Sequence, residues 1–276
     1  MLLKKKVINS GSTKTMAKPI ARVSFITRAK SVSEVEEFWS AMFYGRSGTG
    51  KTTLAASFPK DSLLLDFRDK GTNSIRNVKG IKVLEMINWD YVEGTYWDLK
   101  NTKHGYKTVI IDTIDGMQRL AMDQVKADNN KDESDALSQR EWGEISGKVS
   151  QWMINFRDLP MNVVFLSQER IKNQADDENT SDYDEGQIEP EVGPALMPSI
   201  ARSLNAAVNI IGNTYIKQTI KKEGVKSIRQ TYFMLRIGPN PFYITKIRKP
   251  KEFVVPQAIA NPTYEKLMKI SKGERI

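Results

Sequence analysis

Short apolar runs alternate along the chain with longer stretches in which apolar residues recur every three or four positions. A short apolar run bounded by polar residues is typical of a buried strand, and the longer periodicity is typical of an amphipathic helix. The predicted strands are 41–44, 62–66, 81–85, 108–112, 161–169 and 207–212, and the predicted helices are 54–58, 114–125, 138–156, 198–204 and 264–270. This alternation predicts an α/β fold with a mainly parallel central sheet and helices on both faces.

The pattern changes after residue 212. Residues 214–220 and 228–237 alternate polar and apolar positions on either side of Lys221-Lys222-Glu223-Gly224, which predicts an antiparallel β-hairpin over 214–237. A short, basic edge strand is expected over 243–250. The central sheet should therefore carry an antiparallel C-terminal extension.

The N-terminal residues are weakly patterned. Residues 1–20 contain several lysines and small polar residues, and we expect a loosely held arm. Residues 22–27 alternate as a strand does, and Ser33 with Glu36 forms the capping-box pattern of a short helix that runs to Trp39. The expected organisation is a basic arm over 1–38, one core domain over 39–270 that includes the hairpin, and a tail over 271–276.

Two tryptophans lie on the apolar stripe of the predicted helix 138–156. Ser138 and Glu141 form the capping box of this helix, and Pro160 ends it. Tryptophan at helical spacing is more often part of a core than a platform on which bases stack. We therefore expect Trp142 and Trp152 to be buried.

One stretch carries recognisable chemistry. Residues 45–52 spell Gly-Arg-Ser-Gly-Thr-Gly-Lys-Thr, which fits the phosphate-loop pattern G-x-x-x-x-G-K-[ST] without a substitution. Because a predicted strand precedes it and a helix follows it, its N–H groups should cradle a triphosphate. We expect Lys51 to reach the β- and γ-phosphates of ATP and Thr52 to bind Mg²⁺. The expected nucleotide-binding residues are Gly45, Arg46, Ser47, Gly48, Thr49, Gly50, Lys51, Thr52 and Thr53.

Three of the predicted strands end in a carboxylate, namely Asp66, Glu85 and Asp112. The run Thr108–Asp112 is the clearest, and it follows the phosphate loop by about 60 residues. We expect Asp112 to hold Mg²⁺ directly or through water, and a simple strand-end cap is the alternative. The strand over 161–169 ends in polar residues, so Ser167 and Gln168 are candidates to sense the γ-phosphate.

Charge is unevenly distributed along the chain, whose net charge is +9. Residues 1–33 hold eight lysines or arginines and no acid, and residues 217–251 hold ten basic residues against Glu223 alone. Residues 169–193 hold nine acidic residues. The basic regions favour a polyanionic partner, although solvated basic faces would give the same composition.

Composition also excludes several classes of protein. The chain contains no cysteine, which excludes disulfides, thiolate metal sites and cysteine nucleophiles. No apolar run approaches the roughly 20 residues of a membrane span, and the N-terminal lysines are not followed by the apolar core of a signal peptide. We therefore expect a cytoplasmic protein without a membrane partner.

Taken in order, the motifs resemble a known family. They are the phosphate loop, Leu-Leu-Leu-Asp at 63–66, Lys-Thr-Val-Ile-Ile-Asp-Thr-Ile-Asp at 107–115, Val-Val-Phe-Leu-Ser-Gln-Glu at 163–169, Glu-Val-Gly-Pro-Ala-Leu-Met-Pro at 191–198 and Thr-Lys-Ile-Arg-Lys-Pro at 245–250. This set resembles the small bacteriophage ATPases with a minimal RecA-like core, some of which serve as recombinases or single-strand-annealing partners. The resemblance covers about residues 40–270. It implies a RecA-like P-loop NTPase fold, ATP and Mg²⁺ as cofactors, and the cytoplasm of a phage-infected bacterial host.

The resemblance also implies roles for single residues. Gln168, or Ser167 beside it, falls where RecA-like proteins place a γ-phosphate sensor. Lys246 and Arg248 match the basic pair that these ATPases project into the nucleotide site of a neighbouring subunit. Hydrolysis would then depend on assembly into a ring or filament. A basic edge strand that faces solvent or DNA is the alternative for this pair.

The residue that activates the attacking water is less clear from the resemblance. RecA-like proteins commonly carry a glutamate just after the second strand, but Arg68 stands near that position here, followed by Asp69. We rank Asp69 ahead of Glu85 for this role. If neither side chain polarises water, the nucleotide would act as an assembly switch more than as a fuel.

The implied function is a recombinase with DNA-stimulated ATP hydrolysis. Single-stranded DNA is the implied partner, and a phage single-strand-binding protein is a further candidate. DNA binding would depend on the arm 4–30 or on the hairpin, whose basic residues are Lys217, Lys221, Lys222, Lys226 and Arg229 and whose aromatic residues are Tyr215, Tyr232 and Phe233. Those aromatics suit either base stacking or ordinary strand packing. A motor or helicase-loader ATPase that acts on a protein, and a nucleotide-gated module with little turnover, are the alternatives.

Overall fold

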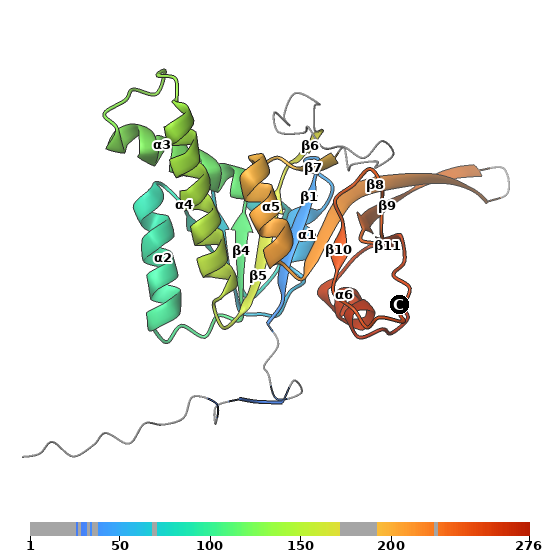
Figure 1. Ribbon diagram of the computed structural model, residues 1–276. Coiled ribbons are helices and arrows are strands. Elements are labelled where there is room, and N and C mark those ends of the chain that lie inside the picture. Colours follow the sequence, from blue (N-terminus) through green and yellow to red (C-terminus); the bar gives the residue numbers. More distant parts are fainter. Residues whose placement is uncertain are drawn as a thin grey trace, which may run out of the picture. The chain divides into compact units, whose positions relative to one another are not determined.

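The computed structural model describes residues 38–67, 71–171, 192–223 and 226–276, together with a few isolated residues between 26 and 34 (Figure 1). Met1–Glu37 and Phe38–Ile276 form two separate units, and the sheet and its helices belong to the second. The predicted strand 22–27, most of the helix expected from Ser33, and Asp69 lie outside the described residues. Trp39, the expected end of that helix, is not helical and lies buried just before the first strand.

Nine strands within the described residues form one sheet, in the order β11-β9-β8-β1-β5-β4-β2-β3, with β10 also paired to β8. The strands from β8 to β3 in this order run parallel to one another, whereas β9, β10 and β11 pair antiparallel. The bounds are β1 Ser40–Gly45, β2 Ser62–Asp66, β3 Ile81–Glu85, β4 Thr108–Asp112, β5 Asn162–Ser167, β8 Ile210–Glu223, β9 Lys226–Arg236, β10 Lys246–Ile247 and β11 Ala258–Ala260. The predicted α/β class and mostly parallel sheet are confirmed.

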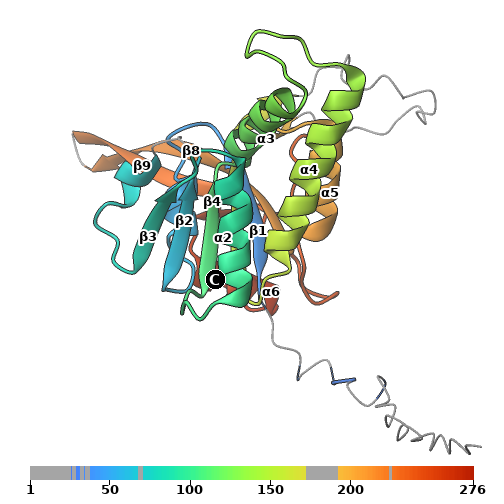
Figure 2. The same cartoon turned by 90° about the vertical axis from the view of Figure 1, so that its left-hand side faces the viewer.

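Helices cover both faces of the sheet (Figures 1 and 2). One apolar cluster joins the sheet to α2 Trp89–Asn101, α3 Ile114–Asp128, α4 Gln139–Arg157 and α5 Pro198–Ala207. The other joins it to α1 Lys51–Ala55, the 3₁₀ helix η3 Gly71–Ile75 and α6 Tyr264–Ser271. Because both faces are covered, the central strands are apolar at successive positions and not at alternate ones.

Strand β1 illustrates this arrangement. Met42 and Tyr44 pack into the first cluster, and Ala41 and Phe43 pack into the second. All four side chains have no exposed surface. Packing on both faces holds β1 in one orientation. The loop that follows its carboxyl end is therefore held in a fixed position as well.

The predicted strand 207–212 and the first hairpin strand are a single element, which corrects the expected break between them. β8 pairs parallel with β1 over Ile210–Thr214 and then antiparallel with β9 over Asn213–Glu223. Figure 1 shows both strands running on past the rest of the sheet. Gly212 lies within β8 and does not interrupt it. Glycine is needed there because the Leu235 side chain packs against its backbone, and a Cβ would lie 2.6 Å from Leu235 Cδ1.

Two short strands flank the acidic segment 172–191, which lies outside the described residues. β6 Glu169–Ile171 pairs antiparallel with β7 Val192–Pro194. The Tyr44 hydroxyl connects β1 to β7, because it donates to the carbonyl of Val192 in β7 (3.2 Å) and also to that of Ile244 (2.9 Å). Burial raises the pKa of Tyr44, so this hydroxyl stays protonated and remains a donor.

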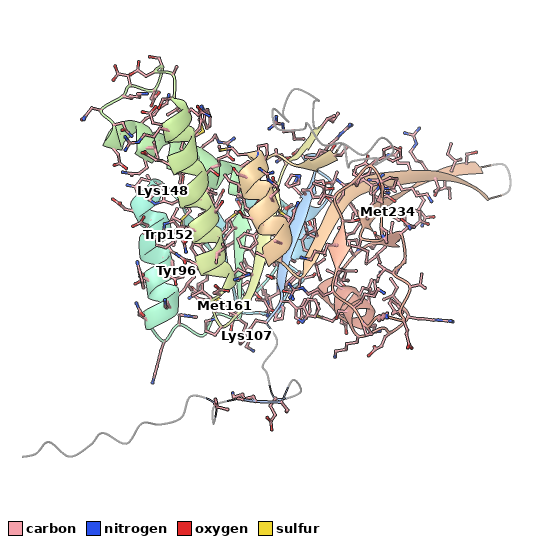
Figure 3. All side chains as sticks on the ribbon, viewed as in Figure 1. Tyr96, Lys107, Lys148, Trp152, Met161 and Met234 are labelled. Atoms are coloured by element: carbon pink, nitrogen blue, oxygen red, sulfur yellow. The ribbon has the colours of Figure 1, made fainter. Side chains whose placement is uncertain are left out.

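The helical layer contains one element that the sequence analysis missed. Helix α2 begins at Asn88, whose side chain accepts from Tyr91 N–H, and it buries Trp89, Val92 and Tyr96 at helical spacing. Tyr96 meets Trp152 of α4 edge to face at 5.2 Å between ring centroids (Figure 3). Trp152 therefore packs against the core as expected. Trp142 does not, since 37% of its surface is exposed, and its predicted burial is wrong.

Candidate active site

Polar residues gather at the carboxyl ends of the parallel strands. The loop between β1 and α1 follows Gly45, and the pairing register places Ser167 at the end of β5 and Thr214 of β8 beside it. Asp112 ends β4, on the other side of β5. In open α/β sheets this edge is where ligands bind, because loops and helix termini expose their polar groups there.

The phosphate loop takes a conformation that requires glycine. Gly50 caps α1 with φ +88°, a left-handed value, and no side chain caps the helix in its place. A Cβ on Gly50 would also lie 3.2 Å from the ring of Phe233 on β9. The Thr49 hydroxyl lies 2.6 Å from the hydroxyl of Thr214 on β8 and donates to the Arg46 carbonyl. The loop is thus fastened to the neighbouring strand.

Lys51 is the central cation of the site. Its side chain is 6% exposed, and its ammonium group donates to the carbonyls of Gly45 (2.8 Å) and Arg46 (3.0 Å) and to Gln168 Oε1 (3.2 Å). A buried ammonium group needs such oxygen partners to offset the loss of hydration. These partners are neutral, so an anionic phosphate oxygen would be a stronger partner for the same donor hydrogens.

Thr52 and Asp112 form the second centre of the site. The Thr52 hydroxyl donates to Asp112 Oδ2 at 2.9 Å, and Asp112 is 2% exposed. Hydroxyl and carboxylate oxygens at this spacing fit Mg²⁺, which takes few protein ligands and completes its shell with phosphate oxygens and water. Among the described residues, no group of three or more histidine, cysteine or acidic side chains gathers to hold a metal ion.

Gly71, at the start of η3, lies against this pair. A Cβ there would be 3.1 Å from Asp112 Oδ2 and 3.2 Å from Thr52 Oγ1, which is tighter than ordinary contacts. Glycine thus leaves room for a ligand between the two oxygens. The sequence analysis did not single out this residue.

These groups surround one cavity of about 350 Å³. Its volume lies at the lower end of the range for small-molecule sites. The lining residues are Ser47, Gly48, Gly50, Lys51, Thr52, Thr53, Gly71, Asn73, Ser74, Gln168 and Phe233. Six of the nine predicted nucleotide-binding positions therefore line a single cavity.

The two γ-phosphate sensor candidates have different positions. Gln168 lines the cavity and accepts from Lys51, while its own N–H donates to Asp115 Oδ1 at 3.2 Å. Ser167 is fully buried, and its hydroxyl donates to the Gln168 carbonyl. Only Gln168 can meet a ligand without a rearrangement. The Asp115 carboxylate accepts from the backbone N–H of Gln168 and so positions this residue. The sequence analysis missed this role of Asp115.

The candidates for water activation are less well placed. Glu85 ends β3, is exposed, and does not line the cavity. In the sheet register Asp66 stands between Glu85 and Asp112, so Glu85 is two strands away from the magnesium-binding pair. Asp69 lies outside the described residues. Asp66, which the sequence analysis did not choose, is the strand-end carboxylate next to Asp112.

Lys246 and Arg248 lie away from the cavity of their own chain. Lys246 pairs with Ile211 and the Arg248 N–H donates to the Asn209 carbonyl, near the amino end of β8, whereas the loop lies beside Thr214. The Lys246 ammonium group donates to the carbonyls of Asn205 and Ala206 at the end of α5, and its pKa is lowered by burial and then by Arg248. Arg248 is exposed.

A polar chain links the loop to the base of the hairpin. Arg46 pairs with Glu169 at 2.8 Å, Glu169 accepts from Asn213 at 3.2 Å, and Asn213 accepts from Arg236 at 2.6 Å. The Arg236 guanidinium lies 3.7 Å from the Tyr215 ring centroid and 4.2 Å from that of Tyr243. Since Arg46 is mostly exposed, the first link adds little stability, but it connects the loop to β6 and β8.

A phosphate loop on a strand-to-helix turn, with a strand-end aspartate beside its threonine, defines a P-loop nucleotide-binding protein. Residues 37–248 match the model of the AAA domain family, and the chain belongs to that family. Members of this family generally bind ATP with Mg²⁺ and hydrolyse it. No curated protein matches the chain. Within the part of the chain that the structure describes, no helix has both the length and the apolar character needed to cross a bilayer.

Proposed function

We propose that this protein is a RecA-like ATPase of bacteriophage type that assembles on single-stranded DNA for recombination or strand annealing. The observation that carries the proposal is the convergence of Lys51, Thr52 and Gln168 on one cavity, with Asp112 hydrogen-bonded to Thr52. Lys51 and Thr52 begin α1 after β1, Gln168 follows β5, and Asp112 ends β4, so the residues gather at the carboxyl ends of three adjacent parallel strands.

Each of these side chains has a role that follows from its chemistry. Lys51 exchanges the carbonyls of Gly45 and Arg46 for oxygens of the β- and γ-phosphates. Thr52 and Asp112 hold Mg²⁺, which supplies positive charge to the transferring phosphoryl group when it is bound. Gln168, already in contact with Lys51, responds to the γ-phosphate by changing partner. Its neighbour Glu169 begins β6 and pairs with Arg46 of the loop.

Assembly is the second part of the proposal. Lys246 and Arg248 do not line the cavity of their own chain, so they would act on the nucleotide of a neighbouring copy. A cation supplied across an interface stabilises charge in the transition state and makes hydrolysis depend on assembly. Arg248 is the better candidate because it is exposed, whereas Lys246 would first have to leave the end of α5.

Contact with DNA is the third part. The hairpin formed by β8 and β9 is basic by sequence, and Lys217 lies in register with Tyr232 on one face of it. A cation beside an aromatic ring suits a strand with a charged backbone and stacking bases. Tyr215 is less suited because Arg236 covers its ring, and Phe233 faces the phosphate loop.

One observation favours a second candidate, a nucleotide-gated switch with little turnover. Among the described residues, neither Glu85 nor any other carboxylate lines the cavity beside Gln168. A site that binds ATP·Mg²⁺ without a positioned base would change assembly with the nucleotide and hydrolyse it slowly.

The test is ATP hydrolysis measured with and without single-stranded DNA, together with electron microscopy of the same mixtures. We expect stimulation by DNA and nucleotide-dependent rings or filaments. Replacing Lys217 and Tyr232 together with alanine should weaken DNA binding and lower the slope of log K against log salt by about 0.7 for a lost phosphate contact. The control replaces the exposed Lys79 and Lys103, near the β3 end of the sheet.

The outcomes separate the candidates. Stimulation by a protein but not by DNA would favour a loader or motor ATPase. Nucleotide-dependent assembly without measurable turnover would favour the switch. ATP binding that survives loss of Lys51 would contradict the site itself.

A further inference from the structure

A second cavity, of about 270 Å³, adjoins the phosphate cavity. Gly50, Thr53 and Phe233 line both cavities, so only these residues stand between them. The remaining lining residues of the second cavity are Thr49, Leu54, Asn261, Pro262 and Thr263. It therefore lies between the first turn of α1, strand β9 and the connection from β11 to α6.

The walls of this second cavity are mainly apolar. Leu54 forms part of the apolar cluster beneath α1, and Phe233 and Pro262 come from two different elements. Phe233 is 43% exposed, although it lies beside Gly50 of the loop. A large aromatic side chain left open next to a phosphate site is available to stack on a flat ring.

Besides three threonines, one amide side chain, that of Asn261, lines the second cavity. Asn261 has φ +46°, and its N–H donates to the Phe233 carbonyl at 2.6 Å, so its backbone is fixed by the strand that carries Phe233. Within the described residues, no hydrogen bond to its side-chain amide is recorded, and the residue is exposed. The amide can offer one donor and one acceptor side by side, which matches the edge of adenine.

We propose that this second cavity holds the purine base of the nucleotide whose phosphates occupy the loop, with the ring stacked on Phe233 and its edge against Asn261. The inference rests on the proposed function. The triphosphate ends at Lys51 and Thr52, and Thr53 is the next residue along α1 and lines both cavities. A nucleotide that leaves the loop past Thr53 enters the second cavity, whose mainly apolar walls suit a base and not another triphosphate.

The experiment compares two ligands that share the phosphates and differ in the base. ATP and inorganic tripolyphosphate, each with Mg²⁺, are titrated calorimetrically into the full-length protein. We expect Phe233→Ala to weaken ATP binding by about tenfold or more. Tripolyphosphate binding should weaken far less than ATP binding, since tripolyphosphate has no base to stack on the ring. Phe233→Tyr should restore most of the affinity for ATP.

Two further variants sharpen the comparison. Ile216 lies in register with Phe233 on the neighbouring strand and is equally exposed, at 43%, but it does not line the cavity. Ile216→Ala should therefore leave ATP binding intact. Asn261→Gly keeps a backbone that tolerates the positive φ and removes only the amide. It should weaken ATP by about fivefold or more and reduce discrimination between ATP and GTP.

The outcomes distinguish this inference from the proposed function. If ATP binds wild-type protein but Phe233→Ala and Asn261→Gly bind it as tightly, the base lies elsewhere and only this inference fails. If Phe233→Ala weakens ATP and tripolyphosphate equally, the ring supports the loop and does not stack, which also overturns it. If wild-type protein binds neither ligand, the proposed function fails and takes this inference with it.

Discussion

At the scale of single residues, the site depends on polar side chains that hydrogen bonds within the protein already hold in place. Lys51 is almost completely buried and donates to two loop carbonyls and to Gln168. Thr52 donates to Asp112. Each of these bonds fixes a polar group that a bound nucleotide would use, so little side-chain ordering is left to be done on binding.

Lys51 gives the first prediction. Lys51→Ala should lower ATP turnover by about 100-fold or more, because it removes the cation aimed at the β- and γ-phosphates. The fold should survive, since the helix and strand on either side are held by apolar packing. Steady-state hydrolysis and thermal melting check both statements.

The matched control for Lys51 is Lys60→Ala. Lys60 also donates to a backbone carbonyl, that of Ala56, but it lies beyond the far end of α1 and does not line the cavity. This variant should keep normal turnover. Normal hydrolysis by Lys51→Ala would contradict the assignment of the site.

Gly71 gives the second prediction. Gly71→Ala should raise the Mg²⁺ concentration needed for half-maximal ATP binding by about tenfold or more, because its Cβ would crowd Asp112 Oδ2 and Thr52 Oγ1. Titration of Mg²⁺ at fixed ATP measures the effect. Gly147→Ala is the control, since a Cβ there meets nothing within 4 Å. An unchanged Mg²⁺ requirement in Gly71→Ala would show that the pair does not bind the metal.

At the scale of elements, the N-terminus of α4 is fixed by a buried carboxylate. The Glu141 side chain accepts from Lys131 at 2.6 Å, from the Ser138 N–H at 2.6 Å and from the Ser138 hydroxyl at 2.7 Å. These bonds, with the Lys131 bond first, lower the pKa of Glu141 from 4.5 to about 2. The capping box was predicted from Ser138 and Glu141, but Lys131 was not part of that prediction.

This carboxylate gives the third prediction. Because the pKa is lower in the folded state, Glu141 stabilises the fold fully above about pH 5 and loses that effect as the pH falls through 4.5 toward 2. Glu141→Gln should therefore lower the unfolding midpoint most at neutral pH, and the difference from wild type should shrink on acidification. Urea unfolding at several pH values measures it.

The control for this prediction lies on the same helix. Glu144 pairs with Arg140 at 3.1 Å, but both side chains are exposed, so the pair should contribute little. Glu144→Gln should change the unfolding midpoint only slightly. A Glu141→Gln deficit that stays constant from pH 6 to pH 3 would contradict the proposed role of the charge.

At the scale of the whole molecule, the two groups of cations proposed for hydrolysis belong to opposite ends of the parallel strands. Lys51 follows the carboxyl end of β1, whereas Arg248 hydrogen-bonds near the amino end of β8. One chain cannot bring both to one nucleotide without unfolding the sheet. Two chains related head to tail can, and such contacts generate rings or filaments.

Shared sites give the fourth prediction. Arg248→Ala should bind ATP but lose assembly-dependent turnover, and Asp112→Ala should lose turnover because its magnesium site is broken. Mixing the two variants should restore part of the activity, because some interfaces then combine an intact Asp112 from one copy with an intact Arg248 from the next. Hydrolysis measured across mixing ratios gives the test.

The control for this experiment is Lys249→Ala, which removes the exposed basic neighbour of Arg248 and should keep normal turnover. No recovery of activity at any mixing ratio would count against a shared site. Arg248 would then be part of a basic edge that faces solvent or DNA, which was the alternative from the sequence.

Much of the fold could be predicted because its signals are local. The runs 62–66 and 108–112 coincide with β2 and β4, since a strand covered on both faces must be apolar throughout. The run 81–85 coincides with β3, which is a more exposed strand at the edge of the sheet. The helix α2 carried a comparable signal in Asn88 and the spacing of Trp89, Val92 and Tyr96, and it could have been found. The exposure of Trp142 could not have been predicted from the sequence. The apolar stripe shows that Trp142 lies on the inner side of its helix, but it does not show whether a neighbouring helix extends far enough to cover it.

The sequence by itself determined the phosphate loop, the aspartate that ends the strand 108–112 and the α/β class, because each is written in contiguous residues or in a repeated short period. Only the tertiary structure decided which distant residues share the site. It placed Gln168 and not Ser167 against Lys51, put Asp66 between Asp112 and Glu85, and brought Phe233 and Gly71 onto the loop. The positions of these residues follow from the order of the strands in the sheet. That order is set by the packing of the whole sheet, and no short stretch of chain can encode it.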